Sequence, residues 1–250
     1  MLRTVTAIRY VAPLREGGSL PALVEADDDG LYVVKLRGAG QGPKALVAEV
    51  VVGVLARRLG LPVPEVVLVK LDPQLPDAEP DPEIQDLLAA SAGLNMGMDF
   101  LPGSLPYTPG EESLVDPLLA ARVIWLDALT ENVDRTARNV NLLLWHRKLW
   151  LIDHGAALYR QHAGLDPVKA REPFAQIRDH VLLGAASSIA DADASLAARV
   201  TRAVVEEAVA DVPAPWLDDV PASAYVDWLT ARLEAPRAWV EEAEDARAGA

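Results

Sequence analysis

The chain has 250 residues, 51% of them hydrophobic, which indicates a folded globular protein of one domain or two small ones rather than a disordered chain. It has no cysteine, so disulfides and thiolate metal sites are excluded and a reducing cytoplasm is the expected compartment. The formal net charge of −14 argues against nucleic acid as a partner, because nucleic-acid-binding surfaces are normally basic.

The first part of the chain alternates strand-like runs with one long helix. Three strands are predicted, at Leu20–Glu25, Leu31–Leu36 and Val66–Leu71. A helix is predicted from Pro43 to Leu59, because proline is favoured in a first turn and Gly60 and Pro62 follow the last periodic position. The valines and leucines of this helix recur at helical spacing, so we expect its apolar stripe to pack on the sheet.

The middle of the chain is expected to be mostly loop. Residues 72–86 contain four prolines and many acids, the composition of an exposed connection. After Asn95 the segment MGMDFLPGS is apolar and punctuated by glycine, and we expect it to cross between two lobes. From Asp116 onward the pattern becomes helical, with helices predicted at Pro117–Leu129, Ala175–Leu183, Ala192–Ala210 and Ala222–Ala248, the last with a break at Pro236.

Residues 129–158 carry the strongest chemical signal. Two apolar, strand-like runs, Asn141–Trp145 and Leu149–Asp153, flank a short polar turn, and this pattern predicts a β-hairpin. Asn139 lies just before the first strand and Asp153 ends the second. Both side-chain oxygens are therefore expected at one edge of the hairpin.

Asp134, Asn139 and Asp153 together form the set that phosphoryl transfer requires. One carboxylate must lie near the attacking nucleophile, and a carboxylate with an amide oxygen can hold Mg²⁺ on a triphosphate. Mg²⁺ prefers such oxygen ligands and usually takes one or two protein carboxylates. Each residue has an ordinary alternative as a solvated acid or a turn residue. Their order and the intervening hairpin favour a nucleotide site.

These residues resemble the HipA-like branch of the protein-kinase superfold and, more distantly, the phosphoinositide kinases. The most specific motifs are DRTARN, from Asp134 to Asn139, and LWLIDHG, ending at Gly155; a second part comprises VVK ending at Lys35 and GLPVP starting at Gly60. The resemblance implies an α+β, two-lobed kinase-like fold, with ATP and Mg²⁺ between the lobes and phosphate transfer to a hydroxyl group. It also suggests a bacterial protein.

The resemblance assigns the lobes along the chain. Residues 1–95 correspond to a small β-rich N-lobe with one long helix, residues 96–101 to a hinge, and residues 102–250 to a mostly helical C-lobe with the catalytic loop and metal-binding hairpin. The hinge would contact adenine through Met98, Asp99, Phe100 and Leu101. Met98 and Phe100 are equally well explained as core residues.

The resemblance also assigns roles residue by residue. Asp134 matches the catalytic aspartate that orients the acceptor hydroxyl, and Asn139 and Asp153 match the metal ligands. Lys35 matches the lysine that contacts the α- and β-phosphates, and Glu49 on the following helix is the acid best placed to pair with it. A solvated lysine and a surface helix acid are the ordinary alternatives for this pair.

Two glycine-containing loops compete for the place above the phosphates. Gly17, Gly18 and Ser19 precede the strand at Leu20 and are equally typical of a hairpin turn. The second loop contains Gly38, Gly40 and Gly42, which also resemble the dinucleotide-binding βαβ unit of an oxidoreductase. Their spacing is one residue short of that fingerprint, so the kinase interpretation is favoured.

Three departures from the protein-kinase pattern leave the phosphate acceptor open. Asn132 stands where a histidine is usual, His154 replaces the phenylalanine of the metal triplet, and no Ala-Pro-Glu motif follows. The acceptor can therefore be a protein or a small molecule. An ATP-binding pseudokinase is the alternative function, but the residues that degenerate kinases usually lose are present here.

The remaining features predict no further chemistry. The longest apolar run, residues 47–61, is interrupted by Arg57 and Arg58 and is shorter than the roughly 20 residues of a membrane helix, so we expect no membrane span. The N-terminal residues lack an uninterrupted apolar core, so no secretory signal is expected. The four histidines match no zinc template and the six tryptophans fit apolar patterns, so we expect structural roles for both.

Overall fold

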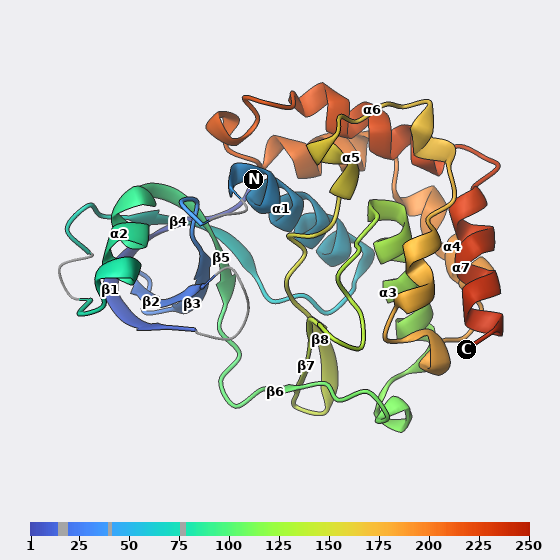
Figure 1. Ribbon diagram of the computed structural model, residues 1–250, viewed down its shortest axis with the longest axis horizontal. Coiled ribbons are helices and arrows are strands. Elements are labelled where there is room, and N and C mark those ends of the chain that lie inside the picture. The colour runs from blue at the N-terminus through green and yellow to red at the C-terminus, as the bar shows by residue number, and fades with distance from the viewer. Residues whose placement is uncertain (15–19, 40–41, 76–78) are drawn as a thin grey trace.

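The computed structural model describes residues 1–14, 20–39, 42–75 and 79–250, which form two lobes (Figure 1). One lobe is a closed β-barrel and the other is mostly helical. Helix α1 (Gly42–Leu59) lies between them. The expectation of an α+β fold with a small β-rich lobe and a larger helical lobe is confirmed.

The barrel, in the part of the chain that is described, has the strand order β1-β2-β3-β5-β4. The strands are β1 (Thr4–Pro13), β2 (Ala22–Ala26), β3 (Leu31–Lys35), β4 (Val66–Leu71) and β5 (Gly93–Asp99). Neighbouring strands are antiparallel except where the barrel closes, because β1 pairs in parallel with β4 and places Val5 opposite Val69. Val24, Val34 and Val67 are fully buried in the barrel core.

Strand β5 lies where the sequence analysis predicts no strand, and it runs through residues expected in the hinge. Residues 96–99 belong to the barrel, and the chain leaves it after Asp99. Glycine is unfavourable inside a strand, so Gly97 weakens the sequence pattern that would predict β5. The packing nevertheless requires a glycine here, since a Cβ atom would meet Val67 Cγ2 at 3.1 Å and collide with Val69. The close approach of two strands, which the sequence does not reveal, explains the glycine.

Helix α2 (Pro82–Ala90) overlaps the end of the segment predicted as an exposed loop, so that prediction is wrong for residues 82–86. The Asp81 carboxylate accepts a hydrogen bond from the backbone N–H of Glu83 at 3.1 Å, and Pro82 occupies the first helical position. Aspartate and proline both favour a helix start in these positions. The helix then buries Ile84 and Leu88 against the barrel core.

The helical lobe is built around α3 (Pro117–Thr130), which is buried along most of its length. Asp116 caps the start of α3 by accepting a hydrogen bond from the backbone N–H of Leu118 at 2.9 Å. The surrounding helices are α4 (Ile189–Leu196), α5 (Arg202–Ala210), α6 (Ala222–Leu233) and α7 (Ala238–Ala248). Helices α4, α6 and α7 pack on α3, and α5 packs on α1 and α6.

Helix boundaries in this lobe agree with the sequence only in part. The break at Pro236 is confirmed, but the single helix predicted over residues 192–210 is wrong, because it ends at Leu196 and Thr201 starts a new one by capping Val204. The helix predicted at residues 175–183 is reduced to a 3-10 turn over residues 175–179. None of the helices described has both the length and the apolar character needed to cross a membrane.

The predicted β-hairpin is present as β7 (Leu142–Trp145) and β8 (Lys148–Leu151), and a short strand β6 (Leu105–Pro106) pairs with β7. His146 and Arg147 form its two-residue turn, with φ angles of 49° and 62°. Positive φ at both positions is typical of the tight turns that match the twist of a hairpin. Strand β8 stops at Leu151, so Asp153 lies just beyond the sheet.

Gly97→Ala tests the close strand contact inside the barrel. The added methyl group has to displace Val69 or shift β5, and overpacking of this kind typically costs about 1–3 kcal/mol. We therefore expect a lower free energy of unfolding in urea titrations. Gly184→Ala is the matched control, because a Cβ atom at Gly184 meets nothing within 4 Å. Equal stability of the two variants would contradict this account of the barrel.

Candidate active site

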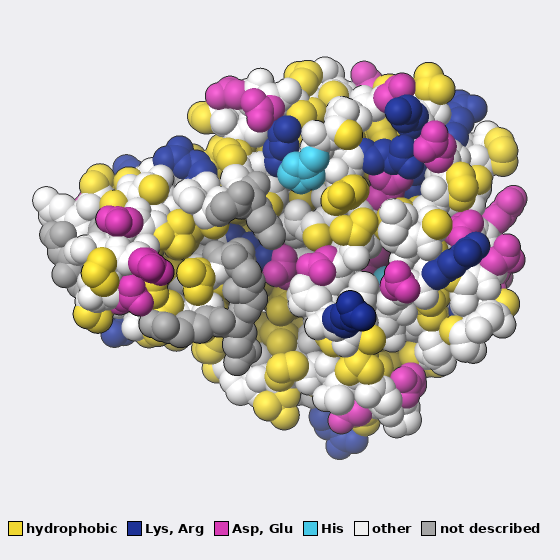
Figure 2. Space-filling model, in the orientation of Figure 1, with side chains coloured by type: hydrophobic (Ala, Val, Ile, Leu, Met, Phe, Trp, Pro, Cys, Tyr) yellow, Lys and Arg dark blue, Asp and Glu magenta, His cyan; other side chains and the backbone are white. Residues whose placement is uncertain are grey.

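A cavity of about 860 Å³ lies between the two lobes, within the size range of small-molecule sites. Its walls come from β3 and β5, the segment that follows β5, and the loops that flank the β7-β8 hairpin. Acidic side chains are visible in the middle of the molecule, where the lobes meet (Figure 2). Most of the residues predicted for the nucleotide and metal site line this cavity: Lys35, Met98, Asp99, Phe100, Leu101, Asp134, Asn139 and Asp153.

Lys35, Glu49 and Asp153 meet at the inner end of the cavity. Lys35 is the last residue of β3, and its Nζ lies 2.6 Å from Glu49 Oε1 and also contacts Asp153 Oδ1. Glu49, on α1, is fully buried, and its Oε2 accepts a hydrogen bond from the backbone N–H of His154 at 2.9 Å. The expected pairing of Lys35 with Glu49 is thus present in the geometry, and it connects the barrel, α1 and the end of the hairpin.

The Lys35 ammonium and the Asp153 carboxylate stabilise each other's charged forms, whereas burial, together with the charge of Asp153, raises the pKa of Glu49 in spite of Lys35. Burial alone would lower the pKa of Lys35, but the carboxylates of Glu49 and Asp153 reverse the effect and raise it. Burial would raise the pKa of Asp153, and the Lys35 ammonium outweighs it, so the pKa of Asp153 is lowered. Lys35 is therefore a cation and Asp153 an anion at neutral pH, as phosphate and metal contacts respectively require.

Asp134 and Asn139 face each other across the mouth of the cavity. Asn139 Nδ2 donates a hydrogen bond to Asp134 Oδ2 at 2.6 Å, and the backbone N–H of Asp134 donates to Asn132 Oδ1 at 3.1 Å. Partial burial raises the pKa of Asp134, and the charge of Asp153 adds to the rise while Asn139 and Asn141 oppose it. A carboxylate with a raised pKa is a better proton acceptor, which suits a group next to a hydroxyl nucleophile.

The loop alternatives fare differently. Gly17, Gly18, Ser19 and Gly40 lie outside the described residues. The dinucleotide-binding alternative is wrong, because β3 and β4 are not neighbours and β5 lies between them, antiparallel to both. The backbone N–H of Gly38 donates a hydrogen bond to Ser91 Oγ at 3.0 Å, and Gly38 does not line the cavity.

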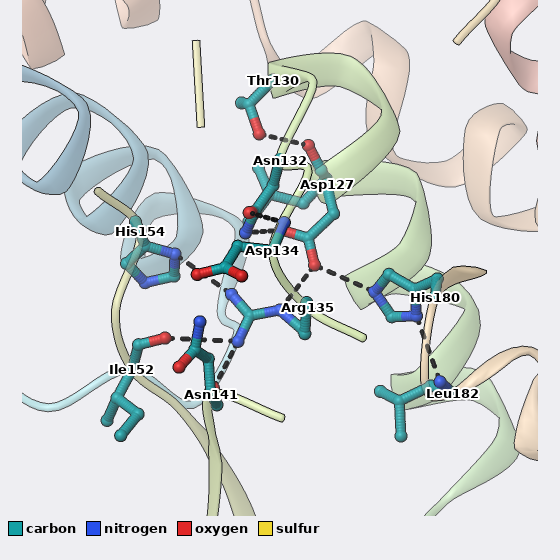
Figure 3. Close-up of polar contacts among 11 residues, drawn as sticks. Asp127, Thr130, Asn132, Asp134, Arg135, Asn141, Ile152, His154, His180 and Leu182 are labelled. Carbon is teal, nitrogen blue, oxygen red and sulfur yellow. Dashed lines mark hydrogen bonds and ion pairs between the residues drawn. The ribbon is translucent and has the colours of Figure 1, made fainter. Parts of the chain in front are cut away.

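A buried ion pair that the sequence analysis missed lies beneath Asp134 (Figure 3). Asp127, at the end of α3, and Arg135 are both fully buried in their side chains, and Arg135 Nε lies 2.6 Å from Asp127 Oδ2. Asn132 Nδ2 donates to Asp127 Oδ1 at 3.0 Å, and His180 Nε2 is 3.0 Å from Oδ2. Burial would raise the pKa of Asp127, but Arg135 and His180 outweigh it and hold the pKa well below its usual range.

Arg135 extends this network to the hairpin. Its Nη1 donates to the backbone carbonyls of Asn141 and, at 3.2 Å, of Ile152, which precede β7 and follow β8 respectively. Its Nη2 lies 3.3 Å from His154 Nδ1. The Arg135 side chain therefore holds the loop that carries Asp134 against the backbone on both sides of the hairpin. Asn139 and Asp153 flank this hairpin, one before β7 and the other after β8.

The two buried histidines are part of the same network. Burial, with help from Arg135, lowers the pKa of His154 to about 3, so its ring is neutral and its Nδ1 can accept from Arg135. His180 also has a lowered pKa because it is buried, and its Nδ1 accepts from the backbone N–H of Leu182 at 3.1 Å. A lone acid in the apolar helix at Asp127 and an arginine next to Asp134 were the only sequence signals for this network.

The barrel lobe, the helical lobe and the charged cavity between them define a protein-kinase-like fold. The chain is similar to the Helicobacter pylori proinflammatory kinase CtkA, with a TM-score of 0.57 and 13% identity over 100% of this chain and 99% of that one. It is also similar to the Golgi casein kinase with Mn/ADP bound, with a TM-score of 0.57 and 12% identity over 98% of this chain and 74% of that one. Likeness at such low identity shows the fold alone.

The family is shown by the sequence itself. No curated protein matches the chain. The model of the HipA-like kinase family matches residues 7–242, which is most of the length. The chain therefore belongs to the HipA-like kinase family, and the resemblance carried by the motifs at Asp134 and Asp153 is confirmed.

Asp127→Asn tests the buried ion pair. The substitution keeps the shape of the side chain but leaves Arg135 buried without a countercharge, and breaking such a pair typically costs about 3–5 kcal/mol. We expect a loss of that order in the free energy of unfolding, measured in urea. Asp227→Asn is the control, because it removes the partner of Arg202 at the surface and should leave stability close to that of the wild type. A loss no larger than that of the control would contradict the role given to Asp127.

The buried ring of His154 predicts sensitivity to acid. Its pKa is about 3 in the folded chain and near 6.5 in the unfolded chain, so between these values only the unfolded chain binds the proton. Stability is therefore retained above pH 6.5 and falls as the pH is lowered toward 3. In urea titrations between pH 6 and 4, the free energy of unfolding of His154→Phe should depend less steeply on pH than that of the wild type. The difference in slope should correspond to one proton, about 1.4 kcal/mol per pH unit.

The control for this pH experiment is His162→Phe, because the ring of His162 is exposed. This variant should keep the wild-type slope of unfolding free energy against pH. Identical slopes for the wild type and His154→Phe would show that the buried imidazole does not contribute to acid sensitivity.

Proposed function

We propose that this HipA-like kinase is an ATP- and Mg²⁺-dependent phosphotransferase that moves the γ-phosphoryl group to a hydroxyl of a protein or small molecule. The observation that carries the proposal is the meeting of Lys35, Asp134, Asn139 and Asp153 in one cavity. Lys35 comes from the barrel and is far in sequence from the short stretch that carries the other three residues. Their convergence is what phosphoryl transfer requires, because its catalysis depends mainly on positioning and charge neutralisation.

The nucleotide would lie in the cavity with its base against the barrel side. Val33, Met96 and Met98 line the cavity from the barrel, and Leu101 and Ile152 line it from outside the barrel, so together they offer the apolar surface that a purine ring needs. Asp99, the last residue of β5, and Phe100, which follows it, also line the cavity, where the edge of the base would lie. Lys35, held by Glu49, would contact the α- and β-phosphates.

Asp153 and Asn139 are the residues that would hold the divalent ion. Both line the cavity, and both offer the oxygen donors that Mg²⁺ prefers. Asn139 donates through its nitrogen to Asp134, which leaves its side-chain oxygen free of that bond. When bound, the ion would neutralise negative charge on the phosphates. Asp153 also contacts Lys35, so an ion bound to Asp153 would compete with this ion pair.

Asp134 is assigned to the acceptor. In the proposed step the acceptor oxygen forms a bond to the γ-phosphorus, the bond to the ADP oxygen breaks, and the acceptor proton passes to the Asp134 carboxylate. The raised pKa of Asp134 and its hydrogen bond from Asn139 support this role. A serine or threonine hydroxyl is the acceptor that we propose first, by analogy with the kinase class rather than from a docking surface.

Substitution of Asp153 and Asp134 separates binding from transfer. Asp153→Asn should reduce metal-dependent ATP turnover by roughly 10²-fold or more while the thermal midpoint changes little, because the ion loses its carboxylate.

Asp134→Asn should retain nucleotide affinity, measured by calorimetry with ADP and Mg²⁺, and lose transfer. Asp218→Asn, an exposed acid far from these motifs in sequence, is the matched control and should behave as the wild type.

The acceptor itself can be sought with ATP labelled at the γ-phosphate. The native chain is incubated with cell extract, and labelled protein and small-molecule fractions are compared with those from Asp134→Asn. Asp134-dependent label in a protein band would support a protein as the phosphate acceptor. Asp134-dependent label in the small-molecule fraction would instead indicate that the acceptor is a metabolite. Tight ADP binding without any Asp134-dependent label would favour a nucleotide-binding pseudokinase.

A further inference from the structure

The segment that follows Asp153, residues 155–186, is ordered without long helices or strands. It consists of short 3-10 turns, at residues 159–162, 169–171, 175–179 and 183–185, joined by irregular chain. At its start the backbone N–H of Leu158 donates to the carbonyl of Thr130 at 2.6 Å. The segment therefore lies directly against the end of α3, from which the loop carrying Asp134 begins.

A buried arginine connects this segment to α3. Arg232, on α6, is fully buried and donates to the carbonyls of Leu129 at 2.7 Å and Ala128 at 2.6 Å, and also to that of Ala170 at 2.8 Å. A cation near the last carbonyls of a helix also interacts favourably with the helix dipole. Burial lowers the pKa of Arg232 to about 10, so it remains charged at neutral pH.

Glu131 joins Arg232 to a second arginine. Glu131 ends α3 with a positive φ of 49° and immediately precedes Asn132. Its buried carboxylate lies 3.2 Å from Arg232 Nη1 and 3.0 Å from Arg160 Nε. Arg160 also pairs with Glu172, because Arg160 Nη1 lies 2.8 Å from Glu172 Oε2. Both ends of the 160–172 stretch are therefore connected to Glu131, where the Asp134 loop starts.

The sequence of this segment gives an independent observation. From residue 155 to residue 186 there is no serine and no threonine, and Tyr159 carries the only side-chain hydroxyl. In kinases whose segment after the metal triplet is ordered by phosphorylation, the phosphate creates new pairs with arginine. Here Glu131 and Glu172 already supply negative charge to Arg160, and no serine or threonine is available to receive a phosphate.

We propose that Glu131, Arg160, Glu172 and Arg232 form a permanent ion-pair clamp, the Glu131 clamp, which holds residues 155–186 against the Asp134 loop without phosphorylation. The inference rests on the proposed phosphotransferase function, and it adds that the enzyme is active as synthesised. Arg160 and Arg232 are positioning residues in this account, because they act on Asp134 through Glu131 and the end of α3. Arg160 is the better site for a test, since its side chain is 27% exposed whereas that of Arg232 is fully buried and its loss risks unfolding.

Hydrogen exchange of the segment tests the clamp independently of activity. Arg160→Gln should increase amide exchange in peptides covering residues 155–172 by about tenfold, while exchange in the barrel stays unchanged. Arg160→Lys, which keeps the charge, should restore part of the protection. Arg171→Gln is the matched control, because Arg171 lies in the same segment and forms an exposed ion pair with Glu234. Loss of this exposed pair should leave exchange at the wild-type level. Wild-type exchange in Arg160→Gln would overturn the clamp.

Kinetics test the link to transfer. With ATP labelled at the γ-phosphate, Arg160→Gln should lower kcat for transfer by about tenfold with KM for ATP changed less than about twofold, because the nucleotide cavity is not touched. Phosphatase-treated wild type and Tyr159→Phe should keep full activity. Loss of activity on phosphatase treatment or in Tyr159→Phe would overturn the inference. A wild type that never transfers label would reject the proposed function instead, while the exchange result would still decide the clamp.

Discussion

The buried pair between Asp127 and Arg135 is the interaction on which the arrangement of the site depends. It joins the end of α3 to the loop that carries Asp134, and the same guanidinium binds the backbone on both sides of the β7-β8 hairpin. Burying two charges costs several kcal/mol per ion unless each finds a partner and hydrogen bonds. Here Asn132, His180 and His154 complete the network, so the loop and hairpin have one well-defined relative position.

A second constraint connects the lobes. Helix α1 is buried along both faces because it lies between the barrel and the helical lobe, and Glu49 is its one buried charge. That carboxylate receives Lys35 from the barrel and the backbone of His154 from the hairpin. The cation assigned to the phosphates and the acid assigned to the metal are thus both positioned from α1, and they form an ion pair with each other.

The sequence predicts the parts of the site that are local and misses those that depend on packing. The hairpin, α1 and the set Asp134, Asn139 and Asp153 follow from short-range patterns, and the cavity brings that set together with Lys35. Strand β5 was missed because Gly97 is required by a close contact with another strand. Helix α2 was missed because the prolines before it and at its first position resemble loop composition. Asp127 and Arg135 gave almost no signal, since a buried ion pair is defined by partners distant in space rather than by spacing in sequence.

Diffraction from crystals grown with ADP and Mn²⁺, recorded at the manganese absorption edge, tests the central claim most directly. We propose that side-chain oxygens positioned by the Asp127–Arg135 pair and by α1 meet around one divalent ion. The account predicts an anomalous peak bound to Asp153 and Asn139, with the nucleotide base against Met98 and Leu101 and its phosphates near Lys35. A nucleotide bound outside this cavity, or an ion that does not contact Asp153, would contradict it.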